Sequence, residues 1–146
     1  MRHRAKRADY PESRAISVAM AARGNAKWEK PEELPEVELT AHGVARFSVM
    51  YHKSLDWILA HEHPVDEHLS WADALERVGL DDFADTLREA GRFWEEFQRA
   101  EHENRLSNHM ELAFRPRMQA FEGAMPEERF LAVTDAYFEK NYDWAD

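Results

Sequence analysis

The stretch Trp71–Trp94, WADALERVGLDDFADTLREAGRFW, predicts two amphipathic helices in succession. Its apolar residues recur three or four positions apart, which is the spacing that lines one face of a helix. Gly79 divides the stretch, because glycine readily adopts the left-handed backbone that ends a helix. We therefore expect a short helix before Gly79 and a long helix over about 82–104. The expected buried residues are Trp71, Leu75 and Val78, followed by Phe83, Leu87, Ala90, Trp94 and Phe97.

Capping residues predict where these and the neighbouring helices begin. The expected N-caps are Ser70 (with Asp73 at the capping-box position), Asp81 or Asp82, Thr40 and Ser107. The helix after Thr40 is expected over about 41–60, with Val44, Phe47, Tyr51, Leu55 and Ile58 on its apolar face. The helix after Ser107 is expected to be interrupted near Pro116 and to end at Gly123.

Two further helices are expected near the chain ends. One covers about 11–23, and the other begins at Pro126, where the following carboxylates favour the positive end of a helix dipole. Residues 29–38, EKPEELPEVE, contain two prolines and five glutamates. Because proline is unfavourable inside a helix, this stretch predicts an extended connector.

Together these patterns predict an all-α protein, a compact single-domain bundle of about five to seven helices. Within it we distinguish a basic N-terminal arm with the first helix (1–30), a Glu/Pro connector (31–40) and an acidic helical domain (41–146). The apolar faces are wider than the seam of a coiled coil, which favours a bundle.

Composition is typical of a folded protein without disulfide or thiolate chemistry. The 146 residues include 44% hydrophobic residues, five Trp, eight Phe and no Cys. No apolar run approaches the roughly 18 residues that a membrane span needs. No apolar stretch of signal-peptide type follows the basic N-terminus, so we expect a soluble, cytoplasmic protein.

The formal net charge of −10 is unevenly distributed. Residues 1–30 contain eight Lys and Arg against three Asp and Glu, whereas residues 31–146 contain 11 against 26. An acidic domain repels nucleic-acid phosphate and attracts basic surfaces. The arm carries the cations Arg2, Arg4, Lys6 and Arg7 and is expected to be a frayed, solvated terminus.

The densest group of potential metal ligands lies between two expected helices. It consists of His61, Glu62, His63, Asp66, Glu67 and His68. His61 and His63 with a carboxylate have the chemistry to hold Zn or Ni, and a pH-sensitive contact is a further alternative. The segment contains Pro64 and has the composition of a solvated loop, which is our prediction. No His has Glu or Asp three residues earlier, so the di-iron bundle motif is absent.

Motifs for nucleophilic or nucleotide chemistry are also absent from the sequence. None of the serines lies in a Gly-x-Ser-x-Gly elbow, and the five glycines form no phosphate-binding loop. We predict no catalytic residue, no cofactor and no metal, although general acid/base chemistry stays open among so many carboxylates. The aromatic residues are expected in the core; Trp57, Phe93 and Trp144 lie off the expected apolar faces and would mark a binding surface if exposed together.

Carboxylates along the long helix suggest the main functional hypothesis. The predicted partner-binding residues are Asp81, Asp82, Asp85, Glu89, Glu95, Glu96, Glu101 and Glu103. Arg88, Arg92 and Arg99 alternate with them, so an ordinary salt-bridged solvent face is the alternative interpretation.

The segment Trp71–Trp94 resembles the central stretch of the small acidic, all-helical bacterial DNA-mimic protein family. ARFSVMYHKS (Ala45–Ser54) and LAVTDAYFEKNYD (Leu131–Asp143) are similar to that family's neighbouring segments, so the resemblance spans about 45–143. The family's Asn-Gly-Gly-Phe element is absent, and an insertion at 60–70 separates the segments. The resemblance implies an acidic helical protein that occupies the DNA-binding surface of a regulator, with no individual binding residue transferred.

The sequence therefore leaves three functional hypotheses open. The first is a non-enzymatic module that binds and regulates a basic, nucleic-acid-binding protein, such as a regulator or nuclease, through helical carboxylates, without contacting nucleic acid or membrane itself. The second is a metal-dependent or general acid/base enzyme using His61, His63, His68, His102 or His109. The third is a structural or phage-type assembly subunit, a homo-oligomer in which the basic arm docks on a neighbour's acidic domain.

Overall fold

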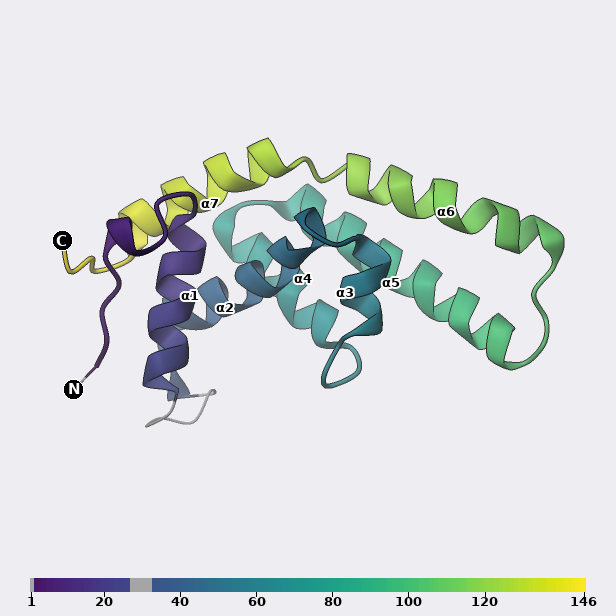
Figure 1. Ribbon diagram of the computed structural model, residues 1–146, viewed down its shortest axis with the longest axis horizontal. Coiled ribbons are helices and arrows are strands. Elements are labelled where there is room, and N and C mark those ends of the chain that lie inside the picture. Colours follow the sequence, from purple (N-terminus) through teal and green to yellow (C-terminus); the bar gives the residue numbers. More distant parts are fainter. Residues whose placement is uncertain (1, 27–32) are drawn as a thin grey trace.

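The computed structural model describes residues 2–26 and 33–146, and these residues form an all-α fold without strands (Figure 1). This confirms the predicted fold class. The α-helices are α1 (Arg14–Asn25), α2 (Glu36–Ser48), α3 (Leu55–Ala60), α4 (Glu67–Val78), α5 (Asp81–His102), α6 (Asn108–Gly123) and α7 (Glu127–Asn141). Two short 3₁₀ helices, η1 (Arg7–Asp9) and η3 (Val49–Tyr51), complete the described elements.

The core lies where α2 packs against α1 and α4, with α5 and α7 closing it on either side. Phe47 on α2 is its aromatic centre: its ring centroid lies 5.6 Å from that of Phe130 on α7 and 6.5 Å from that of Phe83 on α5. All three side chains are fully buried. Gly43 lets α2 approach α4 closely, because a Cβ there would lie 2.7 Å from Cβ of Ala74.

The predicted junction between α4 and α5 is confirmed at Gly79. Its φ of +99° is a left-handed conformation, and the N–H of Leu80 donates to the carbonyl of Leu75 at 2.8 Å. This bonding satisfies carbonyls at the end of α4. The N-cap of α5 is Leu80 without a side-chain cap, so the prediction that Asp81 or Asp82 caps the helix is wrong: both lie in its first turn.

Several other predicted helix starts also need correction. The connector predicted over 31–40 is shorter, because α2 begins at Glu36; residues 31 and 32 lie outside the described residues. Pro35 precedes that helix and has no N–H to leave unsatisfied, and Glu36 and Glu38 favour its positive end. Thr40, predicted as an N-cap, is buried inside α2.

The single helix predicted over 41–60 is divided in two. Helix α2 ends at Ser48, and Ser54 starts α3 by accepting a hydrogen bond from the N–H of Trp57 at 3.2 Å. Helix α4 begins at Glu67, three residues before the predicted cap; the hydroxyl of Ser70 instead donates to the carbonyl of Glu67. Thr40, Ser54 and Ser70 all carry a hydroxyl group that can cap a helix. Tertiary packing decides which of them begins one, and only Ser54 does.

Later boundaries agree with the sequence. Ser107 caps α6 by accepting from the N–H of Met110, α6 ends at Gly123, and α7 begins directly after Pro126. The predicted interruption near Pro116 is wrong, since α6 continues through it. Pro116 itself is exposed to solvent.

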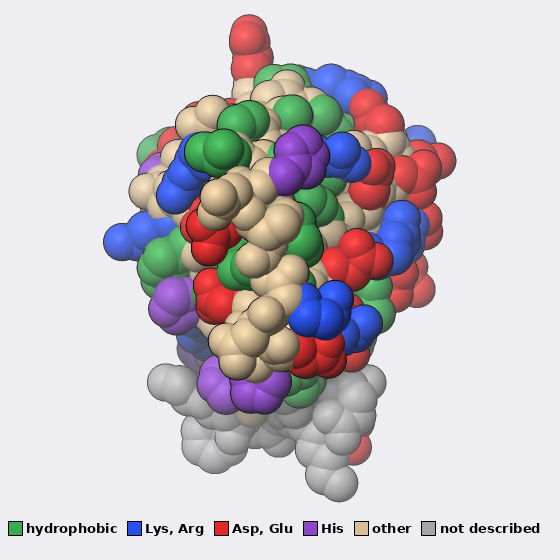
Figure 2. Space-filling model, turned by 90° about the vertical axis from the view of Figure 1, so that its right-hand side faces the viewer, with side chains coloured by type: hydrophobic (Ala, Val, Ile, Leu, Met, Phe, Trp, Pro, Cys, Tyr) green, Lys and Arg blue, Asp and Glu red, His purple; other side chains and the backbone are tan. Residues whose placement is uncertain are grey.

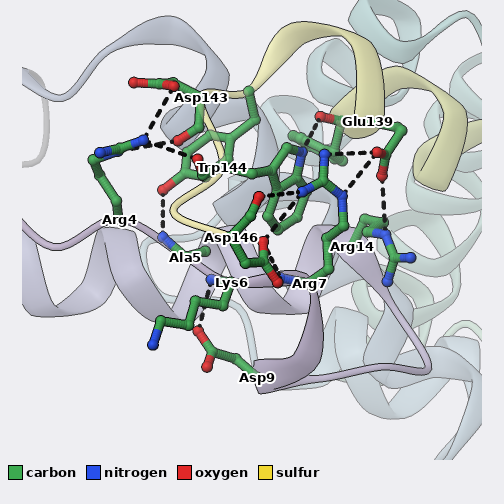
Figure 3. Close-up of polar contacts among 12 residues, drawn as sticks. Arg4, Ala5, Lys6, Arg7, Asp9, Arg14, Glu139, Asp143, Trp144 and Asp146 are labelled. Atoms are coloured by element: carbon green, nitrogen blue, oxygen red, sulfur yellow. Dashed lines mark hydrogen bonds and ion pairs between the residues drawn. The ribbon is translucent and has the colours of Figure 1, made fainter.

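The N-terminal arm is packed against the C-terminal segment, which corrects the prediction of a frayed arm, although the side chains of Arg4 and Lys6 stay exposed to solvent (Figure 3). The backbone N–H of Ala145 donates to the carbonyl of Ala5 at 2.9 Å, and Ala5 is buried. Arg7 forms ion pairs with Glu139 of α7 at 2.8 Å and with Asp146 at 3.1 Å. Opposite charges at the two ends of the chain are therefore neutralised within one molecule.

An aromatic residue lies beneath these ion pairs. Trp144 is 8% exposed, and its indole N–H donates to the carbonyl of Phe138 at 3.0 Å. The guanidinium groups of Arg7 and Arg14 lie 5.1 and 6.0 Å from its ring centroid, a favourable arrangement of cation and π face. We call this set of contacts between residues 4–14 and 135–146 the terminal clamp.

The terminal clamp predicts an acid-dependent loss of stability. The hydrogen bond that Glu139 accepts from Arg7 lowers the pKa of the Glu139 carboxyl below its ordinary value of 4.5. A carboxylate with a lowered pKa stabilises the fold above its unfolded pKa, and this contribution disappears as the pH falls through the folded value. In urea denaturation, Arg7→Gln should therefore reduce stability at neutral pH, and its difference from wild type should shrink as the pH falls below 4.5.

Arg99→Gln is the matched control, because exposed Glu95, one helical turn away, is the only described residue with which Arg99 forms an ion pair. Exposed pairs of this kind contribute little to stability. A wild-type difference for Arg7→Gln that does not change with pH would contradict an ionic role for the clamp.

Candidate functional site

Helix α5 extends beyond the rest of the bundle together with α6 (Figure 1). The two helices form a hairpin whose tip is the segment joining His102 to Asn108. We call residues 92–117 the outer hairpin. Within this range only Ala100 is buried, whereas the first half of α5 buries a continuous face against the core. The outer hairpin is therefore the part of the described chain least covered by its own fold.

Large apolar side chains line the outer hairpin although they are only partly covered. The rings of Phe97 and Phe114 have centroids 4.3 Å apart, and Phe93 lies 6.0 Å from Phe114. Leu112 projects outward and is 78% exposed. Two helices alone cannot enclose these groups, so an apolar surface stays in contact with solvent.

A groove of about 220 Å³ lies between α5 and α6 in this region. Its lining residues are Phe93, Glu96, Phe97, His109, Met110 and Ala113. Glu96 is the only carboxylate of the lining and forms no ion pair with any other described residue. The groove thus combines apolar walls with one carboxylate, that of Glu96, which can accept a hydrogen bond from a group that enters the groove.

The eight carboxylates predicted to bind a partner do not form one uniform surface. Five of them are in ion pairs within the chain, while Asp81, Glu96 and Glu101 form none with another described residue. The pairs are Asp82 with Arg129, Asp85 with Arg88, Glu89 with Arg117, Glu95 with Arg99, and Glu103 with Arg105. The salt-bridged alternative accordingly describes more of α5 than a continuous acidic surface does.

The two halves of α5 also differ in net charge. The outer hairpin contains five Arg and five Glu, so it is electrically balanced. On the inner half, Arg88 binds Glu76 at 2.6 Å and Asp73 at 3.0 Å, both on α4, in addition to Asp85 at 3.5 Å. One cation serves three carboxylates there, which leaves this part of the surface negative. The hydrogen bond from Arg88 also lowers the pKa of Glu76, so that carboxylate is ionised near neutral pH.

Figure 2 shows the end of the molecule formed by the hairpin tip. Acidic side chains on this face stand beside Lys and Arg side chains and do not gather into one patch. Apolar side chains appear between them. This distribution favours recognition by shape and local charge over imitation of a regularly charged polymer.

The histidine-rich segment is largely a solvated loop, as predicted, with His61 and residues 63–66 exposed, but Glu62 and His68 turn inward and its carboxylates hold its backbone. Glu62 accepts hydrogen bonds from the backbone N–H and ring Nδ1 of His68, and both side chains are buried. Glu67 accepts from the N–H of His63 and pairs with Arg46 at 3.1 Å. Among the described residues, no group of three or more His, Asp or Glu side chains is arranged to hold a metal ion.

The three aromatic residues outside the expected apolar faces are not exposed together. Trp57 is 39% exposed on α3, Trp144 is buried in the terminal clamp, and Phe93 lies partly covered in the groove. The sequence singled out Phe93, Glu96 and, for a different role, His109, but not Met110 and Ala113 of α6. A signal was present, because Met110 and Ala113 are spaced to share one helix face.

No family model, no curated protein and no solved structure matches this chain. Among the described helices, none combines the length and the apolar character that crossing a lipid bilayer requires.

Gly91, at the base of the outer hairpin, is packed so closely that we expect any added side chain there to destabilise the fold. A Cβ added to Gly91 would lie 2.3 Å from Nε2 of His68, whose ring is held by Glu62. Gly91→Ala should destabilise the protein by about 1–3 kcal/mol because the buried ring must shift. Gly123→Ala is the matched control, since beyond its chain neighbours and its own helix backbone no described residue has an atom within 4 Å of the added Cβ. Thermal unfolding of both variants measures the difference; equal melting temperatures would contradict this packing.

Proposed function

We propose that this protein is an interaction module that binds a basic protein through the outer hairpin and regulates it by covering part of its surface. The observation that carries the proposal is the groove between α5 and α6, with apolar walls from Phe93, Phe97 and Met110 and with Glu96 at its edge. An exposed apolar patch with a polar rim is typical of surfaces that bind other proteins.

The groove favours a partner of one kind of chemistry. Its volume of about 220 Å³ accommodates one or two apolar side chains, not a whole small domain. Glu96 favours a Lys or Arg beside those apolar groups. An amphipathic helix has this arrangement, because apolar and basic residues four positions apart lie on one face.

Long-range electrostatics supports the same partner. The net charge of −10 attracts basic proteins and accelerates their encounter, while the hairpin itself has equal numbers of Arg and Glu and so does not repel them. The charge of the whole molecule would thus attract the partner, whereas the outer hairpin would form the contact.

A DNA-mimic mechanism is a narrower form of this proposal. Duplex DNA presents one phosphate charge per roughly 1.7 Å of its axis. The internal ion pairs of Asp82, Asp85 and Glu89 reduce the charge that α5 offers to a partner. We keep a basic, nucleic-acid-binding protein as the proposed partner. Because these carboxylates are neutralised, we propose that it is recognised mainly through the groove and not through a row of carboxylates.

Neighbouring charge reversals test the proposal. Tagged wild-type protein is used to capture partners from its native host, and bound proteins are quantified by mass spectrometry. Glu96→Lys should weaken capture of a basic protein by about tenfold or more, equivalent to about 1.4 kcal/mol, because it places a like charge at the groove. Glu95→Lys is the control: it changes the net charge equally, but Glu95 is not among the lining residues and pairs with Arg99.

The outcome distinguishes groove recognition from general attraction. Equal losses for the two variants would leave only non-specific steering and overturn a groove-based mechanism. Unchanged capture with both variants would overturn the proposal altogether. Light scattering of the purified protein adds the third arm: a dimer that Leu112→Glu converts to a monomer would assign the hairpin to self-assembly instead.

A further inference from the structure

A second hollow lies on another part of the bundle, between the end of α2, helix α3 and the start of α4. It has a volume of about 200 Å³ and we call it the indole cleft. Its lining residues are Arg46, Val49, Trp57, Ile58, His61 and Trp71. None of these residues belongs to the outer hairpin, so the cleft is independent of the proposed protein-binding surface.

Two tryptophans give the indole cleft flat apolar walls. Trp71 is almost fully buried, whereas Trp57 is 39% exposed. The ring of Trp57 is stacked on that of His61 with centroids 3.9 Å apart, and Nδ1 of His61 lies 2.7 Å from the Trp57 carbonyl oxygen. These contacts hold the exposed wall in one orientation before any ligand arrives. A preorganised aromatic surface reduces the entropy lost on binding.

The polar groups at the indole cleft are mainly donors. The indole Nε1 of Trp71 is buried and has no hydrogen-bond partner among the described residues. Glu67 engages Nε and Nη2 of Arg46, which orients the guanidinium and leaves Nη1 without a bond to a described residue. Lys53 is not a lining residue, but its ammonium lies 5.6 Å from the ring centroid of Trp57. An unpaired buried donor is costly, so an acceptor that reached Nε1 of Trp71 from the cleft would be stabilising.

We propose that the indole cleft binds a small aromatic carboxylate. A cavity of about 150 Å³ accommodates a benzene ring, and drug-sized ligands need roughly 300 Å³ or more. The cleft, at about 200 Å³, therefore suits one ring with one short polar group. The planar carboxylate accepts from a guanidinium in matching geometry, while the ring packs on the indole walls.

Titration of the protein with benzoate, followed by NMR of the tryptophan indole N–H groups, tests the proposal. The Trp71 resonance is assigned by its disappearance in Trp71→Phe, which keeps an apolar ring but removes the donor. Benzoate should shift this resonance saturably. Benzamide, which has the same ring without the charge, should bind at least about fivefold more weakly because Arg46 gains no ion pair.

Two variants locate the contact. Trp71→Phe and Arg46→Gln should each weaken benzoate binding by about fivefold or more, as measured by calorimetry, while Arg99→Gln should leave it unchanged. Circular dichroism verifies that each variant is folded, and Trp71→Phe remains informative if Arg46→Gln disturbs the pair with Glu67. Absence of a saturable shift, equal binding of benzoate and benzamide, or wild-type affinity in both cleft variants would each overturn the proposal.

Discussion

The unequal lengths of two packed helices underlie the shape and the proposed activity of this protein. Helix α5 has 22 residues and α4, its main neighbour, has 12, so they extend about 33 and 18 Å at 1.5 Å per residue. The core around Phe47 therefore covers only the first half of α5. Helix α6 returns along the uncovered half, but a second helix alone cannot enclose both sides of it. The groove at Phe97 is a direct consequence of this difference in length.

The two ends of the molecule consequently differ in character. At one end, the terminal clamp joins the two chain termini, and Arg7 and Trp144 close the bundle with ion pairs and aromatic packing (Figure 1). At the other end, the outer hairpin leaves apolar rings in contact with solvent. The basic arm serves the fold of its own chain, which weakens the idea of an arm that docks on a neighbour. We propose that the open end is the one that meets other proteins.

Much of the local structure was predictable from the sequence, but the functional surfaces were only partly so. Gly79 and Ser107 act through their own backbone or a neighbour three residues away, and both were identified correctly. Thr40 has the same capping chemistry as Ser107 but is buried inside α2, because packing decides which competing start is used. Similarly, the partners of Asp82 and Glu89 are arginines 47 and 28 residues away. No local pattern indicates such pairs.

The sequence by itself determined an all-α protein with an amphipathic long helix and a strong excess of acidic residues, because helical spacing and net charge are properties of the chain alone. Only the tertiary structure decided which carboxylates are neutralised, where the basic arm lies and which rings stay uncovered. It also brought Arg46 and Trp71, from two different helices, to one cleft. These features depend on distances between residues far apart in the chain, and such distances are set when the helices pack against one another.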